Sequence, residues 1–113
     1  SSQLYSAPLK GTIEKINVVS ASFLESQKSW IFLPSSVKVS FSNDNNIYSN
    51  KKIIKIENKN SNSKANRQTF EINEINVSAR YIKLEGENLR KCPEWHPGSG
   101  GKTWVFLDEI IVE

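Results

Sequence analysis

Short alternating segments, separated by turn-forming residues, constrain the fold of this chain more than any other feature. In residues 37–42, Val37, Val39 and Phe41 occupy every second position, which places them on one face of a strand. Comparable apolar or β-branched segments occur at residues 12–23, 52–57, 69–75, 79–84 and 104–112. No apolar stripe at helical spacing extends beyond two turns. The sequence therefore predicts an all-β sandwich or barrel.

The segments between these strands are expected to be polar connections. Residues 24–29 form a predicted loop, and residues 42–46 form a predicted turn, since Asn and Asp tolerate left-handed backbone and bond their own main chain. Residues 58–66 contain no large apolar side chain and are expected in solvent. The strand at 104–112 is apolar on both faces, which predicts a central strand with Trp104 and Phe106 in the core.

Length and composition fit a single globular domain covering residues 1–113. The chain is 37% hydrophobic and 24% charged, and no apolar run approaches the roughly 20 residues that cross a bilayer. The single cysteine excludes an internal disulfide, and Cys92 is expected to be a buried, inert thiol. The chain contains no methionine and begins with two serines, so we expect a piece of a longer polypeptide.

The positive charge is concentrated in one stretch. The formal net charge is +3, and residues 51–67 hold six basic residues against one acid, Glu57. A nucleic-acid surface of this kind needs interleaved aromatic rings for stacking, and none occurs in this stretch. We therefore expect a solvated, lysine-rich hairpin and no nucleic-acid partner.

Residues 92–109 hold two of the three tryptophans, the only histidine, the only cysteine and three of the five glycines. Turns need only small or φ-restricted residues, so an indole and an imidazole in a Gly- and Pro-rich loop require another explanation. Aromatic and titratable side chains on a loop held by a rigid scaffold indicate recognition. This loop is therefore the candidate functional site.

Several motifs in order resemble a discoidin-like (coagulation factor 5/8 type C) domain, and in particular the C-terminal module of bacterial family 20 β-N-acetylhexosaminidases. They are SWIFLP at 29–34, SND at 42–44, ARYIKL at 79–84, CPEWHPGSGGK at 92–102 and DEI at 108–110. The resemblance implies a galactose-binding-like jelly-roll β-sandwich whose end loops bind sugars. Residues 3–12 resemble the middle of the family's opening region, so part of its N-terminal segment is expected to be missing.

The resemblance also implies a context. The chain would be an accessory module of a larger, exported glycoside hydrolase, located in the periplasm, at the cell surface or outside the cell. Its expected partners are glycans containing N-acetylglucosamine or galactose, and the catalytic domain of the parent chain. No cofactor and no membrane partner are expected. Calcium is doubtful, since Asp108 and Glu109 supply too few of the six to eight oxygens that it needs.

The candidate carbohydrate-binding residues are Trp95, His96, Lys102, Glu94 and Trp30. In the binding interpretation, the Trp95 indole stacks on the apolar face of a sugar while His96 or Lys102 bonds its hydroxyls. In the alternative, Trp95 folds inward to fix its loop and His96 bonds a carbonyl. Trp30 is expected to cap one end of the core and to reach the same loop. The alternative function is thus a purely structural domain that positions the catalytic domain.

Catalysis by this chain is not expected. Glycoside hydrolysis needs two carboxylates on either side of a cleft. Glu94 on a loop, with Asp108 or Glu109 on a strand, offers no evident cleft in so small a sandwich. Arg80 is expected to pair with one of the two strand carboxylates.

Overall fold

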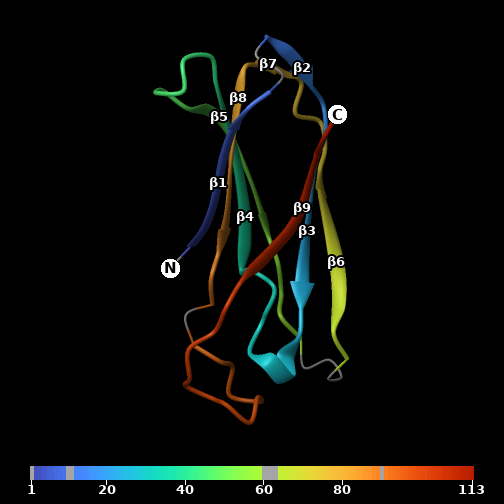
Figure 1. Cartoon of the computed structure of the whole chain (residues 1–113), viewed down its shortest axis with the longest axis vertical. Coiled ribbons are helices and arrows are strands. Elements are labelled where there is room, and N and C mark those ends of the chain that lie inside the picture. The colour runs from blue at the N-terminus through green and yellow to red at the C-terminus, as the bar shows by residue number, and fades with distance from the viewer. Residues whose placement is uncertain (1, 10–11, 60–63, 90) are drawn as a thin grey trace.

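The computed structural model describes residues 2–9, 12–59, 64–89 and 91–113. Strands run along the long axis of a molecule measuring 47 × 22 × 19 Å (Figure 1). No helix within these residues is both long and apolar enough to cross a membrane. The prediction of an all-β chain is confirmed.

The described residues form nine strands and one short 3-10 helix. They are β1 (Ser2–Pro8), β2 (Glu14–Ile16), β3 (Val19–Glu25), η1 (Gln27–Ser29), β4 (Ser36–Ser42), β5 (Ser49–Lys55), β6 (Asn66–Ile72), β7 (Val77–Ala79), β8 (Tyr81–Glu87) and β9 (Phe106–Val112). Antiparallel pairing produces a four-stranded sheet in the order β1-β8-β4-β5, a three-stranded sheet β6-β3-β9 and a two-stranded sheet β2-β7. This arrangement agrees with a β-sandwich, while the jelly-roll connectivity stays a prediction.

The core lies between the two larger sheets and follows from strand alternation. Every second residue of β3, β4 and β8 points to the same face, since side chains alternate along a strand. The inward residues are Val19, Ala21 and Phe23 on β3, Val37, Val39 and Phe41 on β4, and Ile82 and Leu84 on β8. The alternation predicted for residues 37–42 therefore supplies one wall of the core.

The predicted strand at 12–23 is two strands in different sheets. The break falls at Asn17 and Val18, whose backbone N–H groups both donate to the carbonyl of Glu113, at 2.7 and 2.9 Å. The carbonyl of Asn17 accepts from the Ile75 N–H at 3.0 Å. Because the C-terminal residue and the segment before β7 take these groups, the backbone leaves the ladder here and re-enters it in β3. The predicted loop at 24–29 is correspondingly shorter, with β3 reaching Glu25.

The prediction for the last strand is wrong. Strand β9 lies at the edge of its sheet, and Trp104 and Phe106 are 55% and 53% exposed instead of buried. The register between β3 and β9 explains this exposure. Phe23 pairs with Leu107 and its neighbour Ser22 pairs with Glu109. Asp108 therefore has no partner on β3 and forms a bulge. The bulge reverses the alternation, so that the residues packing on the core are Leu107, Ile110 and Val112.

The lysine-rich stretch is not a hairpin. Strand β5 pairs with β4 in one sheet, whereas β6 pairs with β3 in the other, so the chain crosses between sheets after β5. The connection is also not purely solvated, because Asn58 bonds the main chain of Leu33 twice, at 3.1 and 2.9 Å. Within the predicted connection, residues 60–63 lie outside the described part.

The sandwich has two distinct ends (Figure 1). The loop end carries η1 and the long connection from β8 to β9, where the candidate residues lie. The turn end carries the connection from β4 to β5, together with β2 and β7. The sheets thus hold the candidate loop on one end of a rigid scaffold.

Candidate functional site

The candidate loop is closed on itself before it joins β9. Lys91 and Lys102 form an antiparallel bridge across its base. Inside the bridge, the Cys92 N–H donates to the Gly101 carbonyl at 2.8 Å, and the Gly100 N–H donates to the Cys92 carbonyl at 3.2 Å. These bonds satisfy backbone groups that would otherwise depend on water, so the loop has a defined shape.

His96 anchors this loop to η1. Its ring is buried, with Nε2 2.7 Å from the Gln27 carbonyl, and its Nδ1 accepts a hydrogen bond from the Gly98 N–H at 2.9 Å. Because Nδ1 accepts, Nε2 must carry the proton and donate to Gln27. Both ring nitrogens are thereby engaged, and none is left for a sugar hydroxyl. This geometry is the carbonyl-bonded alternative considered from the sequence.

Trp30 provides a second anchor. It follows η1 with a left-handed backbone (φ 64°), and its ring lies against the backbone of Gly98 and Gly101. A Cβ at Gly98 would lie 2.6 Å from Trp30 Cζ2, and one at Gly101 would lie 2.3 Å from Cζ3. Only glycine allows so close an approach of the indole. The expected contact of Trp30 with the loop is therefore present, although the residue stays 38% exposed.

Trp95 combines features of both interpretations. Its ring makes edge contacts with Phe32, at 6.1 Å between centroids and 65°, and with His96, at 6.2 Å and 70°. Phe32 is fully buried, so Trp95 is seated on the end of the core, yet 36% of it is exposed. The indole is thus held in place and still accessible to solvent.

Glu94 and Lys102 are the remaining candidates, and they differ in their contacts. Glu94 is exposed next to Trp95 and has a carboxylate free of salt bridges to other described residues. The ammonium of Lys102 instead lies 4.7 Å from the ring centroid of Trp104, as a cation–π pair. The structure therefore brings Trp30, Trp95 and His96 together and engages Lys102 with Trp104.

Sequence reasoning missed the residues that support this cluster. The predicted loop at 24–29 includes Gln27, and no local pattern links Gln27 or Phe32 to His96. Gly98 and Gly101 carried only part of a signal, because two glycines three residues apart permit close packing of a ring on the backbone, while the ring that packs there, Trp30, lies far away in the sequence.

The strand carboxylates are engaged in a structural ion-pair network. Arg67 Nε lies 3.0 Å from Asp108, and Arg67 Nη2 bonds both Glu109, at 2.5 Å, and Ser22 Oγ. The sequence-based pairing of these acids with Arg80 is therefore wrong, because β6 places Arg67 across β3 from them. Among the described residues, no cluster of three His, Cys, Asp or Glu could hold a metal.

Cys92 is buried, as predicted, and burial raises the pKa of its thiol because the thiolate would lose solvation. The site offers a ligand two partly exposed indoles that each contact the buried His96 ring, and the exposed Glu94 carboxylate. Comparison with protein-family models found no match, and comparison with curated proteins found none.

Proposed function

We propose that this chain is a non-catalytic carbohydrate-binding module whose site is the loop-end surface around Trp95. The main support for this proposal is the Trp95 indole, which stays 36% exposed although His96 and Trp30 fix its loop in place. Sugar rings present apolar C–H faces, and an indole offers a large apolar body with one N–H donor. A ring fixed before binding loses little conformational freedom on binding.

The surface has room for more than a single contact. Trp30 makes an edge contact with the His96 ring at 6.1 Å between centroids, and Trp95 makes one at 6.2 Å, so both indoles contact the same imidazole. Glu94 adds a carboxylate that accepts hydrogen bonds from hydroxyls. The role of His96 in this proposal is to position both indoles, and sugar hydroxyls are bonded by Glu94 and water.

The motif resemblance supplies the context of the proposal. Under this proposal, the module belongs to an exported, β-hexosaminidase-like glycoside hydrolase and binds glycans containing N-acetylglucosamine or galactose. The catalytic acids reside in a separate domain of the parent chain, as in the enzymes that the motifs resemble.

A different observation favours a second candidate, a structural domain that packs on the catalytic domain. Phe106 and Ile111 project from the edge strand β9 and are largely exposed, next to the exposed Trp104. Exposed apolar side chains along an edge strand offer surface that another domain could cover. Under this candidate the Trp95 loop has no ligand and serves only to close the end of the sandwich.

The test is retention of the 113-residue chain on an array of neutral glycans, with two single variants. We expect binding to glycans ending in N-acetylglucosamine or galactose, loss of binding in Trp95→Ala, and unchanged binding in Trp104→Ala. Trp104 is the matched control, because it is a more exposed indole that contacts Lys102 instead of His96. Absence of wild-type binding across the array would refute the proposal.

Unfolding separates the two candidates further. Trp95 is about two-thirds buried, so its truncation is expected to cost about 1–2 kcal/mol and leave a folded chain. A folded Trp95→Ala variant that binds the same glycans as tightly as wild type would refute the Trp95 surface as the binding site.

A further inference from the structure

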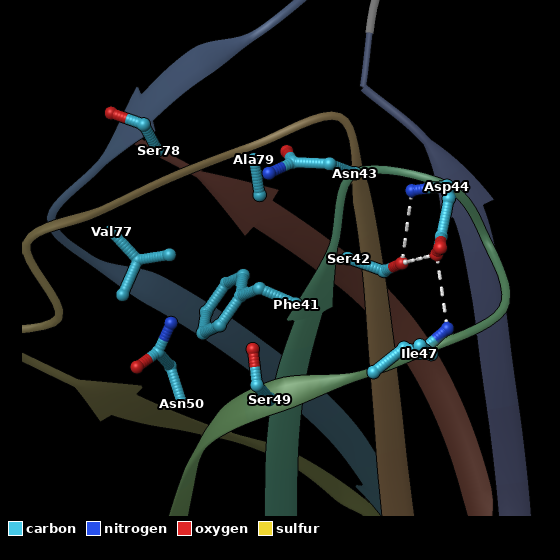
Figure 2. Close-up of a pocket in the computed structure, with 10 residues that line it drawn as sticks. All are labelled: Phe41, Ser42, Asn43, Asp44, Ile47, Ser49, Asn50, Val77, Ser78 and Ala79. Carbon is cyan, nitrogen blue, oxygen red and sulfur yellow. Dashed lines mark hydrogen bonds between the residues drawn. The ribbon is translucent and has the colours of Figure 1, made fainter.

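A pocket of about 250 Å³ lies at the turn end (Figure 2), and Figure 1 shows this end opposite the loop end that carries the connection from β8 to β9. It is enclosed by the end of β4, the following turn, the start of β5, and β7. The lining residues are Phe41, Ser42, Asn43, Asp44, Ile47, Ser49, Asn50, Val77, Ser78 and Ala79. Its floor is apolar, since Phe41 and Ala79 are buried and Val77 packs against the core.

A β-bulge places one polar group in this pocket. Val39 pairs with Lys52 and Phe41 pairs with Ser49, so β5 holds one residue more than β4 over this interval. Within it, Asn50 adopts left-handed backbone, with φ 56°. Bulges of this kind turn a side chain away from its normal face. Figure 2 shows the Asn50 amide on one side of the Phe41 ring, next to the Ser49 hydroxyl.

A hydrogen-bonded turn places the opposite rim. Asp44 Oδ1 accepts from the N–H groups of Asn46 and Ile47, both at 2.9 Å, and from the Ser42 hydroxyl at 2.8 Å. This turn holds Asn43 on the other side of the Phe41 ring (Figure 2). It also presents Ile47, which is 70% exposed, at the mouth of the pocket.

The polar groups of the rim are available to a ligand. The side chains of Asn43, Ser49 and Asn50 make no hydrogen bond to another described residue. Amides and hydroxyls both donate and accept, which matches the mixed demand of sugar hydroxyls. Ile47 and the apolar floor suit the C–H groups of a sugar ring. No lining residue is cationic, and the Asp44 carboxylate disfavours an anionic ligand.

We infer that this pocket is a second binding site, for one uncharged sugar ring, separate from the Trp95 surface. Its volume is below the range of about 300–1,000 Å³ typical of pockets for drug-sized ligands, which limits the ligand to a single ring. Contacts come from Asn43 and Asn50 on either side and from Ile47 at the mouth. The site binds one terminal or free monosaccharide, whereas the loop end accepts a longer glycan.

Amide chemical-shift mapping tests the inference on the ¹⁵N-labelled 113-residue chain. The Trp95→Ala variant is titrated with galactose, N-acetylglucosamine and glucose, and with glucuronate as the acidic comparison. We expect saturable shifts at millimolar neutral sugar for the amides of Asn43, Ile47, Asn50 and Val77. Because Trp95 is absent, these shifts report the pocket even if the loop-end proposal fails.

Two glycine variants form a pair matched in backbone conformation, and Asn45→Gly additionally removes the hydrogen bond that Asn45 Oδ1 accepts from the Tyr48 hydroxyl. Asn50→Gly and Asn45→Gly each replace an asparagine with left-handed backbone, at φ 56° and 60°, so glycine retains both conformations. Only Asn50 lines the pocket. We expect Asn50→Gly to weaken binding roughly tenfold, the effect of about one hydrogen bond, and Asn45→Gly to leave it unchanged. Equal affinity in both variants, absence of shifts with every neutral sugar, or a preference for glucuronate would overturn the inference.

Discussion

The packing of Trp30 on glycine leads to a quantitative prediction for Gly98→Ala. The new Cβ would lie 2.6, 2.9 and 3.1 Å from three carbons of the Trp30 ring, Cζ2, Cε2 and Cη2. Carbon atoms in contact prefer roughly 3.5–4.0 Å, so the ring or the loop must move by close to 1 Å. Overpacking of this kind costs about 1–3 kcal/mol. For a chain of this length, the midpoint of thermal unfolding should fall by roughly 4 °C per kcal/mol.

The same substitution has the opposite effect once the ring is removed. In a Trp30→Ala background, the three nearest contacts of the new Cβ are gone. Gly98 does not adopt left-handed backbone, so alanine there causes no strain of its own. Alanine then mainly restricts the unfolded chain, which stabilises the fold by about 0.4–1 kcal/mol. The effect of Gly98→Ala on the free energy of unfolding should therefore change sign between backgrounds.

The assay is a double-mutant cycle from urea unfolding, followed by far-ultraviolet circular dichroism because two of the variants lack the Trp30 indole. The four proteins are the wild type, each single variant and the double variant. If Gly98→Ala costs the same in both backgrounds, within about 0.5 kcal/mol, the two residues are not coupled and the glycine slot for Trp30 is refuted.

Three further predictions concern groups outside this slot. The N–H groups of Ile47 and Asn46 hold the pKa of Asp44 below its ordinary value of 3.8. The stability that Asp44 contributes is therefore present above that value and is lost as pH falls through the lower pKa of the folded chain. The difference in free energy of unfolding between wild type and Asp44→Ala should accordingly vanish in strong acid. A difference that does not change with pH would contradict this. Cys92 should react with a thiol reagent far more slowly in the folded chain than in denaturant, because it is buried and its pKa is raised; equal rates would place it at the surface. Arg67→Ala should lower the free energy of unfolding by less than about 2 kcal/mol, since its two ion pairs are half exposed, and the loss should shrink at high salt; a loss insensitive to salt would argue against the ion pairs.

The core could be predicted from the sequence because its signal is local. Val37, Val39 and Phe41 alternate within one strand, and that alternation alone determines which face is buried. The turn after β4 was predicted for a similar reason, since Asp44 bonds residues two and three positions ahead of it. Features that depend on contacts between residues a few positions apart can be predicted without knowing which strand lies next to them.

Features set by pairing could not be read in this way. The bulge at Asp108 shifts the phase of β9, so Leu107 and Ile110 share a face that simple alternation assigns to opposite sides. Both faces then look apolar in the sequence, and an edge strand resembles a central one. The anchors of the candidate loop are hidden likewise, because Gln27 lies 69 residues from His96.

The backbone of Trp30 bears on which function the loop end serves. Left-handed backbone suits asparagine, as at Asn50, but for a bulky residue it is a genuine outlier that costs energy. The contacts of the Trp30 ring with Gly98, Gly101 and His96 offset that cost. A connection between β8 and β9 alone requires neither the strained residue nor the glycines. Under the proposed function, these contacts hold Trp95 in one place while its ring stays accessible to a glycan.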